Sequence, residues 1–140
     1  MSSFNVDPKQ FLARIGEYQR RQFAAKLRAM NDNANDLWKE SFKLAPVDEG
    51  TLIGSVAMSR HADQDADLIE FTVGYNTRYA AEVHNDLKPA PGAKKSQGPT
   101  TRNRPPTEFG EAGGLYLQRP LLGKATRWTA HIAKKLKAVR

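Results

Sequence analysis

The stretch from residue 8 to residue 44 constrains the fold more than any other part of this 140-residue chain. Asp7 and Pro8 are a typical helix start, because aspartate caps free backbone N–H groups and proline is tolerated at the first helical position. Pro46 ends the pattern, since the residue before a proline is disfavoured in the helical region. Between them, apolar side chains recur close to the 3.6-residue helical period, at Phe11, Leu12, Ile15, Phe23, Leu27, Met30, Ala34, Leu37, Trp38 and Phe42.

The sequence therefore predicts a helix over residues 8–44, a rod of roughly 55 Å. Gly16 and the polar stretch 31–35 weaken the pattern and allow a kink or break near residues 31–36. A rod of that length exceeds the radius of so small a domain, so we expect it to pack against something outside its own subunit. The apolar fraction of 39% is also low, which favours a chain that depends on neighbouring subunits to bury apolar surface.

The middle of the chain predicts a small antiparallel β-sheet. Residues 51–75 alternate between two faces around a polar loop from His61 to Asp67, which is typical of a β-hairpin. Residues 78–87 carry apolar side chains at spacings of three and four and predict a short helix.

The C-terminal part contains a loop, a strand and a helix. Residues 88–112 hold five of the eight prolines and five bases, and predict a long extended loop of the kind that is functional or disordered until bound. Residues 115–117 predict a short strand, and Pro120 starts a helix that runs to residue 139. Its apolar side is expected to hold Leu121, Leu122, Ala125, Trp128, Ile132 and Leu136.

These elements make one α+β domain over residues 1–140, with a long N-terminal helix and a basic C-terminal helix packed on a small antiparallel sheet. The chain contains no cysteine, which excludes thiolate metal sites and fits a reducing cytoplasm. No apolar run is long enough to span a bilayer, and the N-terminus lacks the apolar core of a signal peptide. We therefore expect no membrane partner and synthesis in a cytoplasm.

The positive charge is concentrated at one end of the sequence. The net charge is +7, and the last 22 residues contain seven bases and no acid, whereas acids and bases balance in the rest. Such asymmetry favours an acidic partner surface, such as a phosphate backbone. The candidate DNA-facing or subunit-interface residues are Lys124, Arg127, Lys134, Lys135, Lys137 and Arg140. The candidate partner-binding residues of the long loop are Lys88, Lys94, Lys95, Arg102, Arg104 and Phe109.

Polar residues elsewhere do not form a recognisable catalytic pattern. Glu82 and His84 lie two apart, and on a helix such residues point to different sides. No zincin, P-loop or nucleophile-elbow motif occurs, so the sequence predicts no enzyme, no cofactor and no metal site. The acidic loop at His61, Asp63 and Asp65 leaves a metal-dependent nuclease as a distant alternative.

The order of the segments resembles the head–tail joining and tail completion proteins of tailed double-stranded DNA phages. The resemblance rests on a long helix followed by APVDEGTL at 45–52, YAAEV at 79–83 and LYLQRPL at 115–121. It covers most of residues 40–130. The family often shows a proline–glycine–leucine turn into the hairpin, a Tyr-Ala segment ending in an acid, and a Phe-Leu-Arg-Pro-like start to the last helix. This chain departs from it at residues 84–86 and in the enlarged loop.

The resemblance implies a structural virion protein that forms a ring, hexameric or dodecameric, in the phage neck or at the head-proximal end of the tail. Such a ring joins head to tail, contacts portal, connector and tail proteins, and leaves a passage for DNA. The main alternative, from a different class, is a basic nucleic-acid-binding protein that acts as a monomer or dimer.

Overall fold

One uninterrupted helix organises the fold. The computed structural model describes residues 5–45, 51–78, 80–85, 107–109 and 113–140. Helix α1 spans Pro8–Leu44, the range that the sequence predicts, and the Asp7 side chain accepts a hydrogen bond of 3.0 Å from the backbone N–H of Lys9. It continues through residues 31–36, where a kink or break was allowed. Asn33 is buried there, and its amide donates to the carbonyl of Trp128 at 3.3 Å, so a tertiary contact offsets its weak helix propensity.

A two-stranded antiparallel hairpin follows. Strands β1 (Val56–Asp63) and β2 (Leu68–Tyr75) pair from Val56 opposite Tyr75 to Asp63 opposite Leu68. The hairpin starts later than the predicted residue 51, because α2 (Thr51–Gly54) is a helical turn. Ser55 closes that turn, since its backbone N–H and its hydroxyl both donate to the Leu52 carbonyl.

The segment before the last helix corrects another prediction. Residues 115–117 form turns, not a strand, and Leu115 has a φ of 57°. Its backbone N–H donates to the carbonyl of His84 in α3 (Ala80–Asn85), while its carbonyl already accepts from the N–H of Arg119. The Leu115 backbone groups are therefore bonded to α3 and to the start of the last helix, and they are not available to pair with a strand. The last helix, α5, spans Gln118–Lys137.

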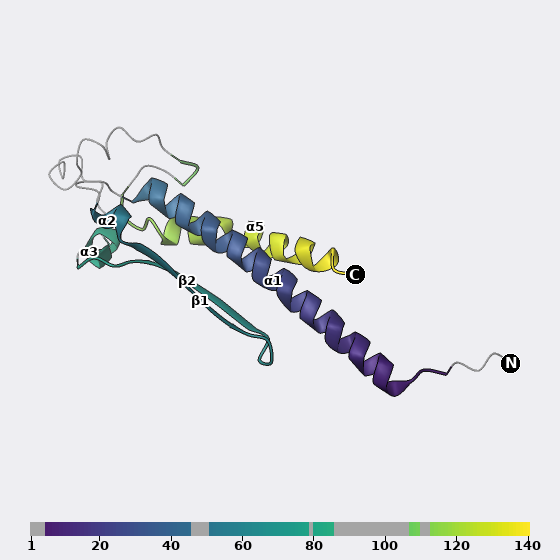
Figure 1. The fold of residues 1–140 in the computed structure, drawn as a ribbon. Helices are drawn as coiled ribbons and strands as arrows, with labels where there is room; N and C mark the ends of the chain where they lie inside the picture. Colours follow the sequence, from purple (N-terminus) through teal and green to yellow (C-terminus); the bar gives the residue numbers. More distant parts are fainter. Residues whose placement is uncertain (1–4, 46–50, 79, 86–106, 110–112) are drawn as a thin grey trace, which may run out of the picture.

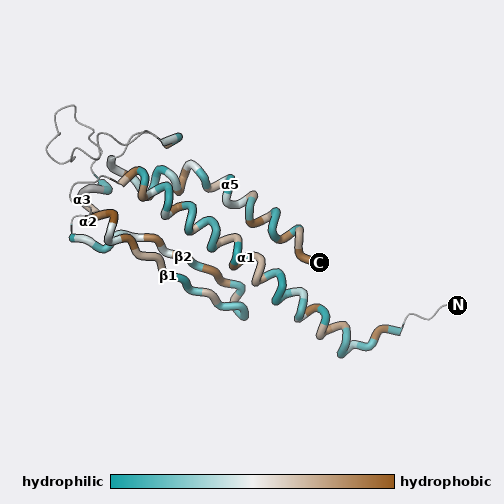
Figure 2. Tube along the Cα trace, turned by 45° about the horizontal axis from the view of Figure 1, so that its top comes forward, coloured by the Kyte–Doolittle hydropathy of each residue, from teal (hydrophilic) through white to brown (hydrophobic). Residues whose placement is uncertain are grey.

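The α+β fold class is confirmed: two long helices, two short helical segments and a small antiparallel sheet form the described structure. Figures 1 and 2 show α1 between α5 on one side and the hairpin on the other. The hairpin tip is tied to α1 by Lys26, whose ammonium lies 2.7 Å and 2.8 Å from the carboxylate oxygens of Asp67. At the other end of this layer, the Tyr75 hydroxyl lies 2.9 Å from Ser41 Oγ. The N-terminal part of α1 extends beyond both neighbours (Figure 1).

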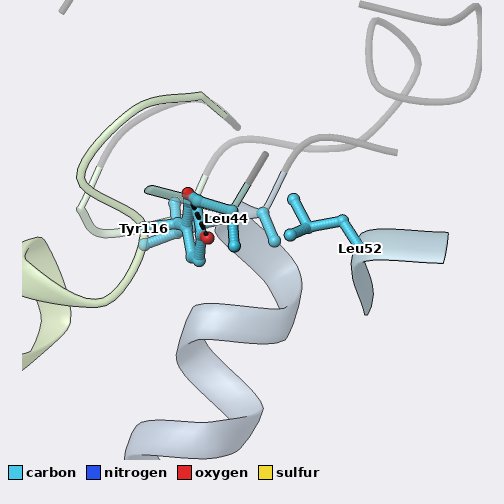
Figure 3. Packing of buried hydrophobic residues seen from close by; sticks show 5 residues of the cluster. Leu44, Leu52 and Tyr116 are labelled. Carbon is cyan, nitrogen blue, oxygen red and sulfur yellow. Dashed lines mark hydrogen bonds between the residues drawn. The ribbon is translucent and has the colours of Figure 1, made fainter. Parts of the chain in front are cut away.

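The hydrophobic core is small and lies at the C-terminal end of α1 (Figure 3). Tyr116 is its largest fully buried side chain, and its hydroxyl donates to the Ala80 carbonyl at 3.1 Å. Its ring packs edge-to-face on Tyr75 and on His84, at centroid distances of 5.0 Å and 5.1 Å. The cluster contains Leu44, Ala45, Leu52, Ala80 and Tyr116. So few large side chains leave most of α1 without an apolar core of its own.

Candidate functional site

Lys124 does not face outward as the sequence suggests. Its ammonium lies 2.9 Å from Asp36 and 3.5 Å from Glu40, and its side chain is 12% exposed. The indole N–H of Trp128 donates to the same Asp36 carboxylate at 2.9 Å. The reason is an acidic stripe on α1: Asp32, Asp36 and Glu40 recur every four residues and so share one helix face. That spacing is visible in the sequence, and it is the signal that could have located Lys124.

The surroundings of this contact also shift the pKa values of Asp36 and Lys124. Burial raises the pKa of Asp36, but hydrogen bonds from Trp128 and Lys124 and the nearby positive charge outweigh it, and the net pKa is lowered. Burial lowers the pKa of Lys124, but the hydrogen bond and charge of Asp36 and the charge of Glu40 outweigh it, and the net pKa is raised. Both groups are therefore charged at neutral pH.

The contact between α1 and α5 is thus largely polar. One turn further along α5, His131 Nε2 lies 3.0 Å from the Asp32 carboxylate. Of the side chains expected on the apolar side of α5, Trp128, Ile132 and Leu136 are half-buried, whereas Leu121, Leu122 and Ala125 are exposed. The expected apolar side is therefore only partly used within the subunit.

Arg127 is partly neutralised by a residue of the predicted long loop. Its guanidinium makes two hydrogen bonds of 3.1 Å to the two carboxylate oxygens of Glu108. Both side chains are exposed, and an exposed ion pair contributes little to stability. Arg127 therefore remains accessible to a partner that can compete with Glu108.

The outward positive surface is the C-terminal end of α5. Lys134, Lys135, Lys137 and Arg140 are all exposed, and within the described residues none of their side chains has an ion pair with an acid. Three of them lie in the last turn, where cations are favoured by the helix dipole. We call these four residues the basic end of α5. It is what remains of the predicted DNA-facing set.

Phe109 is placed differently from the prediction that it binds a partner. Its ring is half-buried against the core cluster, and the ammonium of Lys124 lies 6.0 Å from the ring centroid. Its carbonyl accepts a hydrogen bond of 3.0 Å from Arg119. The other loop candidates, Lys88, Lys94, Lys95, Arg102 and Arg104, lie outside the described residues.

Two glycines in helices provide a test of this placement. A Cβ at Gly123 would lie 2.4 Å from Phe109 Cε1, whereas a Cβ at Gly16 would meet nothing within 4 Å. Gly16→Ala should raise the free energy of unfolding by about 0.5–1 kcal/mol, the usual gain in a helix interior. Gly123→Ala should lose that gain or destabilise the chain, because the ring must move. Thermal and urea unfolding of both variants would measure this, and an equal gain at both sites would contradict the packing of Phe109.

The residues of the nuclease alternative do not converge. His61 and Asp63 are exposed on β1, and one carboxylate oxygen of Asp63 accepts from the backbone N–H groups of Asp65 and Ala66. Asp63 therefore serves the turn. In the parts of the chain that the structure describes, no group of three His, Cys, Asp or Glu side chains is placed to hold a metal ion. His84 packs on Tyr116, while nothing is described of the Glu82 side chain.

An apolar surface lies on the N-terminal part of α1, at the end of the molecule where the C-terminus also lies. Phe11, Leu12, Ile15 and Tyr18 are 53%, 66%, 38% and 48% exposed on the part of α1 that extends past its neighbours (Figure 2). The sequence pattern includes Phe11, Leu12 and Ile15, and the structure adds Tyr18 and shows that nothing in the described chain covers these side chains.

Comparisons with family models, with curated proteins and with solved structures give no match for this chain. Within the described residues, none of the helices has the length and apolar character needed to cross a membrane.

Proposed function

We propose that the chain is a structural protein of a tailed double-stranded DNA phage, synthesised in the host cytoplasm and incorporated into the virion. Copies of it form a ring, hexameric or dodecameric, in the neck or at the head-proximal end of the tail. The ring joins the head to the tail, contacts the portal or connector and the tail proteins, and leaves a passage for DNA. The phage assignment is supported by the order of the long helix and the segments at 45–52, 79–83 and 115–121.

The observation that carries the ring is the exposed apolar face on the N-terminal part of α1. A subunit with a five-residue core cluster and a row of exposed large apolar side chains gains stability by burying that row against another chain. Identical subunits that do so with rotational symmetry form closed rings.

The basic end of α5 supports the position near DNA. Lys134, Lys135 and Lys137 project from the last turns of α5, and a ring repeats them in every subunit. Salt screens such charges beyond about 10 Å at 0.1 M, so the proposed role requires close contact with phosphates or with an acidic face of the next ring.

Charge reversal of these three lysines tests the proposal. The triple change to glutamate should alter the unfolding midpoint of the isolated subunit very little, because exposed charges contribute little individually. It should reduce the yield of infectious, DNA-filled particles, and more strongly than the triple change to glutamine. Particle titre and electron microscopy of the neck would measure this. Normal numbers of joined, filled particles with the glutamate variant would contradict the proposed role of the basic end.

The same basic end also favours the second candidate, a nucleic-acid-binding protein that acts as a monomer or dimer. Mass measurement in solution, alone and with portal or tail components, separates the two functions. The second candidate predicts no assembly with those components. It also predicts DNA affinity that falls steeply with salt and falls further in the glutamate variant.

A further inference from the structure

Two surfaces of the subunit carry opposite charges that are not paired within the described residues. The first is the N-terminal part of α1, which we call the helix patch and which carries the apolar residues Phe11, Leu12, Ile15 and Tyr18 and the bases Lys9, Arg14 and Arg20. Within the described residues these three bases have no acidic partner. Arg21 is different, because it pairs with Glu17 and donates to the Arg140 carbonyl. In the helix patch, Lys9 and Arg14 therefore flank the exposed apolar row with unopposed positive charges, and Arg20 lies on the opposite side of the helix.

The second surface is the end of the hairpin, which we call the acidic tip. Residues 63–70 contain Asp63, Asp65, Asp67 and Glu70 and no base. Asp67 is neutralised by Lys26, and the other three carboxylates have no basic partner in the described part of the chain. Leu68, at the start of β2, is 43% exposed next to these acids. The acidic tip thus presents three unopposed negative charges and one apolar side chain.

The two surfaces cannot meet within one subunit. The tip is held at Lys26, which lies fourteen residues from Leu12 along a continuous helix, or about 21 Å. Figure 1 shows the hairpin ending beside α1 well short of the N-terminal end of that helix. Their complementarity can only be used between two molecules.

We propose that the helix patch of one copy binds the acidic tip of the next copy. This inference rests on the proposed ring and names the surfaces that build it. Arg14 and Lys9 meet the carboxylates of Asp65 and Glu70, while Leu12 and Phe11 cover Leu68. Because the two surfaces differ, the contact is head-to-tail, and such contacts close into a ring when the rotation per subunit allows it.

The charges also disfavour the simplest alternative arrangement. If two helix patches packed on each other across a two-fold axis, Lys9 and Arg14 of both copies would be brought to one interface. Juxtaposed like charges cost several kcal/mol at an interface. The apolar row therefore needs an acidic partner surface, and the tip is the acidic surface that the described chain offers.

A charge-swap experiment tests the contact. The helix variant carries Lys9→Glu and Arg14→Glu. The tip variant carries Asp65→Lys and Glu70→Lys, and leaves Asp63 and Asp67 with their turn and ion-pair contacts. Sedimentation at low ionic strength should show self-association of the wild type that weakens with salt. Each variant alone should associate at least about tenfold more weakly.

Two combinations should restore association. The variant with all four substitutions has an acidic helix patch and a basic tip, so its copies attract again. An equimolar mixture of the helix variant and the tip variant should also associate, because each one supplies the complement that the other lacks. A two-fold pairing of helix patches predicts no rescue in the four-substitution variant.

Matched controls separate this contact from general charge effects and from other surfaces. Lys134→Glu with Lys137→Glu makes the same charge change as the helix variant at the basic end of α5, and it should associate like the wild type. Circular dichroism melts should show that all variants remain folded. The inference is overturned if the wild type stays monomeric at every concentration measured, or if folded single-surface variants associate normally. Absence of association in the mixture of the helix and tip variants also overturns it. So does association that is lost in Leu122→Ser but retained in the tip variant.

The outcomes for the contact and for the proposed function are distinguishable. Charge-swap rescue, together with absence of the protein from the neck of purified particles, would retain the contact and reject the virion role. Presence in the neck, with helix and tip variants that still form rings, would retain the virion role and reject the contact.

Discussion

Replacing Tyr116 by alanine should lower the free energy of unfolding by about 3–5 kcal/mol, the range for deletion of a buried aromatic side chain. Tyr116 is 1% exposed and packs edge-to-face on Tyr75 and His84 at the centre of the core (Figure 3). Among the described residues, the cluster around it holds Leu44, Ala45, Leu52 and Ala80, with Ile53, Tyr75, Phe109 and Leu117 partly buried against it, so the cavity would lie at the centre of this packing. For a domain of this size such a loss is a large fraction of the total stability.

Tyr116→Phe is the matched control. It keeps the ring and removes the hydrogen bond from the hydroxyl to the Ala80 carbonyl, which should cost about 1 kcal/mol. Urea unfolding followed by circular dichroism would measure both variants. If the alanine variant were no less stable than the phenylalanine variant, Tyr116 would not be the centre of the core.

Tyr116 also makes the fold sensitive to alkali. Burial, and to a lesser degree the neighbouring Tyr75, raises the pKa of its hydroxyl from 10.0 to about 12. The neutral form is thus preferred in the folded state, so this contribution is fully present below pH 10 and is lost as the pH rises through about 12. In Tyr116→Phe the corresponding part of the alkaline loss of stability should be absent.

Asp36→Asn should give the second large effect, a loss of about 1–2 kcal/mol, because hydrogen bonds to charged groups are worth more than neutral ones and solvent screens part of this one. The variant retains an acceptor for the Trp128 indole, but it leaves the nearly buried Lys124 with Glu40 alone. Asp32→Asn is the control, since its pair with His131 is exposed and should contribute less than about 0.5 kcal/mol.

The pH dependence of the free energy of unfolding, measured for the wild type and for Asp36→Asn, tests whether the charge of Asp36 causes the difference in stability. The pKa of Asp36 is lowered in the folded state, so its contribution is present above the ordinary carboxyl pKa of 3.8 and is lost as the pH falls below that value. The stability difference between wild type and Asp36→Asn should therefore shrink in acid. The pKa of Lys124 is raised, so its contribution is lost only above pH 10.5. A difference that stayed constant from pH 7 into acid would contradict this account.

Local signals in the sequence predicted the parts of the fold that local physics controls. Asp7, Pro8 and Pro46 set the ends of α1, because capping and proline restrictions act on neighbouring residues. Residues 115–117 were wrongly predicted as a strand. Their composition suits a strand, but their N–H and carbonyl groups are taken up by α3 and α5.

The placement of Lys124 and Phe109 was not predicted from the sequence for the same reason. The C-terminal bases have no acid nearby in sequence, yet Lys124 finds Asp36 across 88 positions of the chain. Phe109 has few apolar neighbours in sequence, but the ring packs against a glycine in α5 that leaves room for it. Exposure, and therefore availability to a partner, depends on which elements lie side by side.

Because α1 is continuous, a small rotation at its core end produces a large displacement at its N-terminal end. Leu44 in the core and Leu12 in the helix patch lie on the same helix, about 48 Å apart at 1.5 Å per residue. A rotation of about 5° at the core end would therefore displace the far end by roughly 4 Å, or about three quarters of the height of one helical turn. Along much of its length α1 is steadied by polar side-chain contacts from α5 and by the Lys26–Asp67 pair. Small adjustments at the core would thus move the helix patch, and in the proposed ring they would alter the spacing between neighbouring subunits.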